Sequence, residues 1–317
     1  LRLVDQHDIV TRLCRLKQQL EGELALRHAV SQVPAHEVGH IITTVTDALT
    51  QSLIRMAERQ LGTPPCRFSW LAFGSQARMD QSINADQDNA LLLAEEPEGN
   101  IGRYFQQLAE WVCHGLADCG VTLCPGNIMA INPELRLSLD GWMHKFSRFI
   151  HSPDPQSILG SSIFFDLRCI YGDAPMVAQL QQHLLQQARS NQLFLFHLAR
   201  GALERTPPLS MLRNFVLEKD SHGDIGVDLK KGGLSLITDM VRIHALANGV
   251  DEINTRRRLQ KLMELGAIDR QDGQNLRDAF DVIAQLRWEK HQQNLMQKQH
   301  SNNLLNPNHL HVLQRNQ

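Results

Sequence analysis

The stretch from residue 68 to residue 94, FSWLAFGSQARMDQSINADQDNALLLA, decides the fold of this chain. Apolar and polar side chains alternate over Arg67–Phe73, which predicts a strand. Ala90–Ala94 is apolar throughout, which is typical of a strand buried on both faces. A Gly-Ser pair and a polar segment stand between them. The stretch therefore predicts two neighbouring strands joined by a polar connection.

The polar connection carries the residues with chemical potential. Asp86 and Asp88 are one residue apart, so in an extended segment both side chains point to the same side. Two carboxylates that close repel unless a cation lies between them, and hard oxygen ligands suit Mg2+. Gly74 allows close backbone approach, and the Ser75 hydroxyl with nearby N–H groups can hold phosphate oxygens. The combination predicts metal-assisted nucleotidyl transfer; the alternative is a turn serine with two solvated aspartates.

Composition excludes some classes of protein. With 317 residues and a net charge of −2, the chain lacks the basic excess typical of a large nucleic-acid surface. No run of about 18 apolar residues is present, so we expect no membrane span. The six cysteines are scattered without a C-x-x-C pair, which favours free thiols and a cytoplasmic location. The chain begins without Met, which is compatible with a missing upstream sensory domain.

Helical periodicity surrounds the predicted strands. We expect an N-terminal helical segment over 1–62, a small mixed α/β domain over 63–173, a helical bundle over 174–299 and a flexible tail over 300–317. The fold class is therefore α+β and mostly helical. Further strands are expected over 120–124 and 161–171. The principal helices are expected over 9–24, 36–60, 101–119, 138–150, 176–199, 208–217, 235–247, 254–265 and 272–298.

The motif G-S-x-x-R-x-D followed by D-x-D resembles the nucleotidyltransferase superfamily related to DNA polymerase β. WLAFGSQARMDQSINADQDNALLL is more closely similar to nucleotidyltransferases found behind CBS-domain pairs or cyclic-nucleotide-binding domains in bacterial signalling proteins. FFDLRCIYGD, DLKKGGLSLITDMVRIHAL and NTRRRLQKL resemble later blocks of that family. The resemblance covers nearly the whole chain. It is specific for the fold and weak for the substrate.

The resemblance implies a reaction and its partners. A nucleoside monophosphate, AMP or UMP, would pass from a nucleoside triphosphate to a hydroxyl of a protein or small-molecule acceptor, with two Mg2+ ions. The helical C-terminal domain would bind that acceptor. Two other interpretations stay open: a nucleotide-sensing regulatory module without catalysis, and a polymerase-like enzyme that extends RNA ends. The near-neutral charge disfavours the last of these.

The superfamily usually has a third carboxylate on a later strand. Asp166, within Phe165-Asp166-Leu167-Arg168, matches that pattern and is a candidate metal ligand or base. Arg168 would then neutralise triphosphate charge. The alternative is a buried ion pair of Asp166 with an arginine that holds the strand in place. Where the family has Glu after the arginine of the Gly-Ser turn, this chain has Asp80.

Several cations are candidates for phosphate binding. Arg78 lies between the Gly-Ser pair and the aspartates, where it would contact a triphosphate or pair with Asp80 or Asp86. Lys230, with Lys231 and Arg242, would approach the site from the helical bundle. For these three the alternative is a solvated or structural role, and 256–258 is expected to be a charged helix face.

A zinc site is a further possibility that the spacing disfavours. His114 and the cysteines Cys113, Cys119 and Cys124 lie near one another in sequence but match no usual ligand pattern. We expect these three cysteines to be buried thiols.

Overall fold

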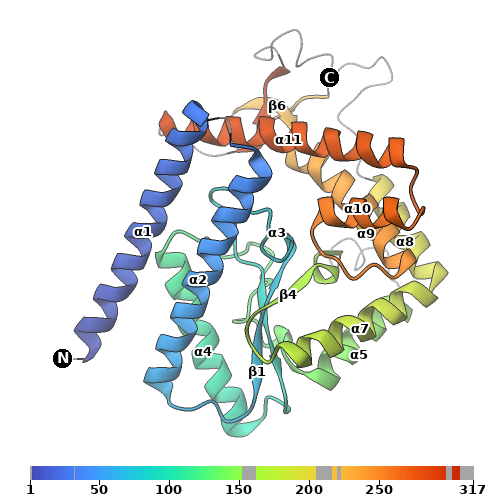
Figure 1. The fold of residues 1–317 in the computed structure, drawn as a ribbon. Helices are drawn as coiled ribbons and strands as arrows, with labels where there is room; N and C mark the ends of the chain where they lie inside the picture. The colour runs from blue at the N-terminus through green and yellow to red at the C-terminus, as the bar shows by residue number, and fades with distance from the viewer. Residues whose placement is uncertain are drawn as a thin grey trace.

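A mixed four-stranded sheet lies at the centre of the structure, a computed structural model (Figure 1). Its order is β3-β2-β1-β4, with β1 antiparallel to both neighbours and β2 parallel to β3. The strands are β1 (Phe68–Phe73), β2 (Asn89–Leu93), β3 (Arg136–Ser138) and β4 (Leu167–Gly172). The residues described are 2–31, 33–151, 162–204, 216–219, 223–297 and 302–307. The first two predicted strands are thus confirmed to within one residue.

Strand β1 is buried along its whole length because helices cover both faces of the sheet. Phe68 and Trp70 pack in a core with α2 (Ala35–Leu61) and α4 (Gly99–Asp118). Leu71 and Phe73 point the other way, into a core with α5 and α7. Because side chains on both faces of β1 enter a core, almost every residue of the strand is apolar.

The first face of the sheet has two helical layers. Helix α2 packs against α4, and α1 (Arg2–Ser31) lies outside α2, as Figure 1 shows at the left. The predicted helices 9–24, 36–60 and 101–119 are confirmed. Helix α2 ends at Gly62, whose φ of 91° is readily accessible only to glycine.

The second face carries α5 (Leu139–His151), α7 (Ala174–Ser190) and α8 (Gln192–Glu204). The predicted helix 138–150 is confirmed, whereas the single helix expected over 176–199 is two helices. Asn191 separates them with non-helical backbone, and its side chain accepts a hydrogen bond from the N–H of Phe194. An N-cap within the helical pattern therefore starts a new helix.

Two of the expected strands are corrected. Residues 120–124 form no strand but a single parallel bridge between Thr122 and Asp86. The segment expected as a strand over 161–171 begins as a 3-10 helix, Ser162–Phe165, and only then becomes β4. Residue 161 lies outside the described part. Asp166 therefore occupies the bend between the 3-10 helix and β4.

The C-terminal part is mostly helical. Helices α9 (Ser235–Asn248), α10 (Thr255–Glu264) and α11 (Arg270–Met296) confirm three predicted helices and share a core of their own. A small sheet that the sequence did not predict joins β5 (Glu218–Lys219), β6 (Ile225–Asp228) and β7 (Leu304–Leu305). Of the helix expected over 208–217, all but the last two residues lie outside the described part, and those two are not helical.

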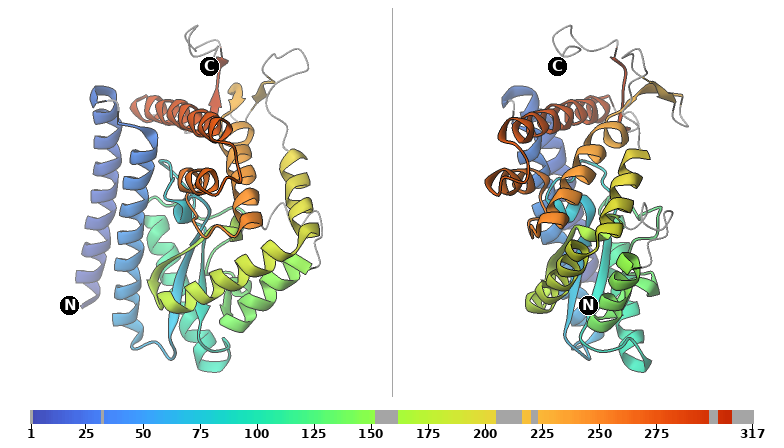
Figure 2. Two further views of the ribbon diagram at one scale, coloured as in Figure 1. Left: turned by 45° about the vertical axis from the view of Figure 1, so that its right-hand side comes forward. Right: turned by 90° about the vertical axis from the view of Figure 1, so that its right-hand side faces the viewer.

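Helix α11 brings the C-terminal part against the N-terminal helices. It lies across the ends of α1 and α2 in all three views (Figures 1 and 2). Trp288 of α11 packs with Val38 and Ile42 of α2 and with Ile83 of the polar connection. The connection that carries the aspartates is therefore enclosed by both ends of the chain.

The cysteines differ from the sequence-based expectation. Cys14 of α1 and Cys119, just after α4, form a disulfide, with Cα atoms 4.3 Å apart and a sequence separation of 105. The prediction that Cys119 is a thiol is wrong because α1 packs close enough to α4 to bring the two sulfurs together. No helix in the described residues combines the length and apolar character needed to cross a bilayer.

The sheet supplies a test of its packing. Gly172 ends β4 with φ of 98°, and a Cβ there would lie 2.0 Å from the carbonyl oxygen of Phe68 in β1. We expect Gly172→Ala to lower the free energy of unfolding by about 3–5 kcal/mol, because it adds a main-chain clash to backbone strain. Urea denaturation measures the change.

Gly62→Ala is the control, since Gly62 also has positive φ but nothing within 4 Å of its Cβ position. That variant should lose only the strain component, about 1–3 kcal/mol. Equal losses in the two variants would contradict the packing of β1 against Gly172.

Candidate functional site

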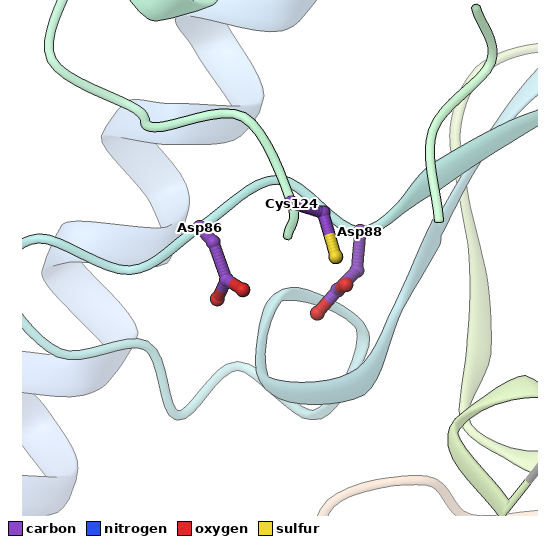
Figure 3. Close-up of side chains that lie close together, drawn as sticks. All are labelled: Asp86, Asp88 and Cys124. Carbon is purple, nitrogen blue, oxygen red and sulfur yellow. The ribbon is translucent and has the colours of Figure 1, made fainter. Parts of the chain in front are cut away.

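Asp86 and Asp88 lie side by side just before β2. Asp86 forms the bridge to Thr122, and Gln87 between them points inward, where its amide donates to the carbonyls of Cys113 and Val121. The two carboxylates therefore point to the same side, as the alternation of an extended segment predicts (Figure 3). A ligand atom of each lies within 4.8 Å of the other and of the Cys124 sulfur.

Asp88 is the more confined of the two carboxylates, with 9 % of its surface exposed. Burial, together with the charge of Asp86, raises its pKa from 3.8 to about 7, although a hydrogen bond from Cys124 and the charges of Lys230 and Arg78 oppose the rise. Ionising Asp88 beside Asp86 is thus costly without added positive charge. A cation beside the two carboxylates would remove this cost.

The Gly-Ser pair stands directly against Asp88. Gly74 has φ of 56°, and a Cβ there would lie 3.2 Å from a carboxylate oxygen of Asp88. Glycine therefore allows the end of β1 to approach the acidic pair. Ser75 follows in the first turn of the short helix α3 (Gly74–Arg78), which leads back toward α2.

A cavity of about 360 Å3 opens in front of these residues, within the size range of small-molecule sites. One wall is the connection from Gly74 to Asp88, and a second is the start of α2, with His36. The remaining wall comes from the C-terminal part. That wall includes Lys230, Ser235, Thr238, Arg242, Arg287 and His291.

Two cations of the C-terminal wall are available to a ligand. Lys230 is exposed, and its charge acts on Asp88. Arg287 of α11 hydrogen-bonds Asn303 at 2.7 Å and Ser82 at 2.9 Å, but it has no carboxylate in ion-pair distance among the described residues. Burial lowers its pKa to about 10. Arg287 was not identified from the sequence, where it belongs to a long amphipathic helix without a motif.

Arg78 lies at the cavity but is already paired. It donates to both oxygens of Asp80, at 3.0 and 3.3 Å, and to Asp166 at 2.8 Å. The ion-pair alternative weighed for Arg78 is thus what the structure contains. Asp80 is one of its two carboxylate partners.

Asp166 is fully buried and receives hydrogen bonds from three arginines. Arg78 donates at 2.8 Å, Arg242 of α9 at 3.1 and 2.6 Å, and Arg258 of α10 at 2.6 Å. Burial alone would raise the pKa of Asp166, but the three guanidinium groups hold it well below its usual range.

The structure does not bring Asp166 together with Asp86 and Asp88 in the described cluster of ligand atoms, and Asp166 is absent from the cavity wall. This arrangement corresponds to the ion-pair alternative for Asp166. The sequence could not reveal it, because Arg242 and Arg258 are 76 and 92 residues away.

Arg168 points away from the cavity. Its guanidinium pairs with Asp47 of α2 at 2.8 Å and donates to the carbonyls of Gln76 and Ala77 in α3. It therefore ties β4 to α3 and α2. Of the residues proposed from sequence, Gly74, Ser75, Arg78, Asp86, Asp88 and Lys230 line the cavity, and Arg168 and Asp166 do not.

Cys124 is the site residue that sequence reasoning assigned to the wrong environment. It is partly exposed rather than buried, and its sulfur lies within 4.8 Å of a carboxylate oxygen of Asp88. Cys113 is buried, as expected. The bridge between Thr122 and Asp86 places Cys124 at the acidic pair, and only the pairing of these two segments would have revealed it.

Two family models match the chain. Residues 21–156 match the model described as "Putative nucleotidyltransferase DUF294", and residues 192–317 match "Putative nucleotidyltransferase substrate binding domain". No curated protein matches the chain. The first match contains Gly74, Asp86 and Asp88, whereas Asp166 lies between the two matched segments.

The raised pKa of Asp88 predicts a dependence of stability on pH. Between pH 3.8 and about 7 the folded protein binds a proton at Asp88 that the unfolded chain has released. Its contribution to stability is therefore present at low pH and lost as the pH rises to about 7. In the presence of a chelator at pH 8, the free energy of unfolding of Asp88→Asn should exceed that of the wild type by roughly 2–4 kcal/mol, as measured by urea denaturation. The difference should disappear near pH 4.

Asp118→Asn is the matched control, since Asp118 is exposed and distant from the cavity wall. Its urea midpoint should follow that of the wild type at both pH values. An Asp88→Asn variant that is less stable than wild type at pH 8 would contradict the electrostatic account of the acidic pair.

The buried ion cluster predicts a large effect on stability. Asp166→Asn keeps the shape of the side chain but leaves three buried arginines without their shared carboxylate. We expect a loss of about 3–5 kcal/mol in the free energy of unfolding. Urea denaturation measures it. Glu264→Gln, which breaks an exposed pair with Lys261, should leave the midpoint unchanged; a similarly small effect of Asp166→Asn would refute the structural role.

Proposed function

Because the chain belongs to this family of nucleotidyltransferases with a C-terminal substrate-binding domain, we propose that it transfers a nucleoside monophosphate from a nucleoside triphosphate to a hydroxyl group. AMP and UMP are the groups that the family resemblance favours, and the acceptor is a protein or a small molecule. The observation that carries the proposal is the pair Asp86 and Asp88, held together just before the start of β2 and lining the cavity.

The donor set fits Mg2+. Two carboxylates share one face, and burial together with the charge of Asp86 raises the pKa of Asp88, so a divalent cation there would favour its ionised form. When bound, Mg2+ ions would polarise the phosphoryl group and favour the attacking hydroxyl. Asp86 and Asp88 would hold the ions. We propose no ligand role for Asp166, whose oxygens accept four hydrogen bonds from arginines.

The residues opposite the acidic pair would bind the triphosphate. The Ser75 hydroxyl would hold phosphate oxygens close to Asp88, and Gly74, which has no side chain, would leave room for them. Lys230 and Arg287, on the C-terminal wall, would neutralise the charge on the same phosphates. Arg78 would act indirectly, by holding the turn through Asp80 and Asp166. The cavity therefore needs both parts of the chain.

The acceptor would enter from the C-terminal part. Its helices supply one wall of the cavity, and the second family model describes this segment as substrate-binding. In such an arrangement the acceptor hydroxyl meets the α-phosphorus at the boundary between the two parts, and pyrophosphate leaves. Closure by helices also excludes water, which favours transfer over hydrolysis.

The proposal is tested by neutralising each aspartate. Asp86→Asn and Asp88→Asn should each reduce label transfer from an α-labelled triphosphate to acceptors in a cell extract by at least about 100-fold, because the metal loses a carboxylate. In the wild type, Mg2+ with the preferred triphosphate should raise the melting temperature by roughly 3–6 °C at about 100 Kd. ATP, UTP, CTP and GTP are compared.

Asp118→Asn again serves as the control and should retain transfer and the thermal shift. Transfer by either active-site variant at near the wild-type rate would refute the metal-site assignment. A thermal shift without transfer in the wild type would instead favour a nucleotide-sensing module.

A further inference from the structure

Cys124 completes a group of three potential metal ligands with Asp86 and Asp88. One ligand atom from each residue lies within 4.8 Å of the other two. Figure 3 shows the thiol approaching from a separate segment of chain, on the side toward which both carboxylates point. In the described part of the chain this is the one group of three such side chains.

The backbone fixes the segment that carries Cys124 on both sides. Before it, the N–H of Gln87 donates to Thr122 at 2.8 Å. After it, the N–H of Asn89 donates to Ile128 at 3.0 Å. Residues 122–128 therefore run alongside 86–89. Main-chain hydrogen bonds at both ends of this segment fix the position of Cys124 relative to the aspartates.

The turn after Cys124 also directs the side chain. The N–H of Asn127 donates to the carbonyl of Cys124 at 3.0 Å, and Asn127 itself adopts φ of 55°. The N–H of Cys124 donates to the sulfur of Met129. The sulfur lies within 4.8 Å of a carboxylate oxygen of Asp88. These contacts leave the thiol directed at the carboxylates.

The chemistry of the donor set distinguishes two kinds of ion. Mg2+ prefers oxygen ligands, so it would use Asp86 and Asp88 and leave the thiol aside. A thiolate selects Zn2+ and similar transition ions, which bind sulfur at about 2.3 Å and carboxylate oxygen at about 2.0–2.2 Å. Ligand atoms on a tetrahedral ion with these bond lengths lie about 3.4–3.7 Å apart. The three side chains, whose ligand atoms lie within 4.8 Å of one another, would therefore have to move closer together on binding.

We propose that Asp86, Asp88 and Cys124 form a mixed carboxylate–thiolate site for a divalent transition ion of the Zn2+ class, which competes with Mg2+ for the two aspartates. On binding, the sulfur–hydrogen bond gives way to a sulfur–metal bond, and the proton passes to solvent. Three protein ligands leave one position of a tetrahedral ion open. The site would therefore hold such an ion reversibly and block the Mg2+-dependent reaction.

The competition with Mg2+ rests on the proposed function, but the binding of the transition ion does not. The simpler alternative is that the Cys124 thiol only supports Asp88 through a hydrogen bond. Cys124→Ser separates the two, because a serine hydroxyl can donate the same hydrogen bond but does not replace a thiolate as a soft ligand.

Co2+ is the probe, because thiolate bound to Co2+ absorbs in the near ultraviolet. Chelator-treated full-length protein, without nucleotide, is titrated with Co2+. The wild type should show the thiolate band at one equivalent, and Zn2+ should abolish it. Cys124→Ser should lack the band and bind Co2+ at least about 10-fold more weakly. Cys66→Ser, which removes a partly exposed thiol that is not one of the three grouped ligands, should retain the band.

A band that persists in Cys124→Ser, or no band in the wild type at saturating Co2+, would overturn the proposal. If the wild-type protein shows Mg2+-dependent transfer but no Co2+–thiolate band, the transition-metal site is overturned and the proposed function stands. A band without transfer would support the site and count against the proposed reaction. In active protein, Zn2+ should inhibit the wild type at lower concentration than Cys124→Ser; equal inhibition would overturn the competition.

Discussion

The structure depends on one buried carboxylate. Asp166 has no exposed surface, and it joins Arg78 of the turn after β1 to Arg242 of α9 and Arg258 of α10. Asp80 and Asp239 pair with two of these arginines, so three acids balance three bases. A buried charge is tolerated only when it is fully paired, and here the pairing needs both parts of the chain. The cluster therefore fixes the C-terminal helices against the turn.

The acidic pair in the cavity has the opposite character. Asp88 is buried beside the like-charged Asp86, and no guanidinium of the described residues donates a hydrogen bond to it, so its pKa rises. The pKa of Asp166 falls because three guanidinium groups surround it. The charge of Asp166 is balanced by protein groups, whereas we propose that the charge of Asp88 is balanced by a bound cation. The two environments lie on either side of Gly74, whose N–H donates to the carbonyl of Asp166 and whose Cα faces Asp88. The separation of structural from reactive acids follows from these contacts.

The sequence was sufficient wherever the signal is local. Strands β1 and β2, the D-x-D spacing and the Gly-Ser turn follow from alternation and turn chemistry within a few residues. The sequence does not predict contacts between distant segments. Two of the arginines that surround Asp166 come from later helices, and the pairing that brings Cys124 to Asp88 joins two segments whose sequences carry no signal that they are neighbours. The split at Asn191 was missed because its capping side chain interrupts an otherwise continuous apolar stripe.

The central claim is that a divalent ion and a triphosphate meet at Asp86 and Asp88. Crystals grown with Mn2+ and a triphosphate whose α,β-bridging oxygen is replaced by methylene test it most directly, through anomalous scattering from manganese. We expect an anomalous peak in contact with both carboxylates, with phosphate density reaching Ser75 and Lys230. A peak at another position, or a nucleotide bound away from this cavity, would contradict it.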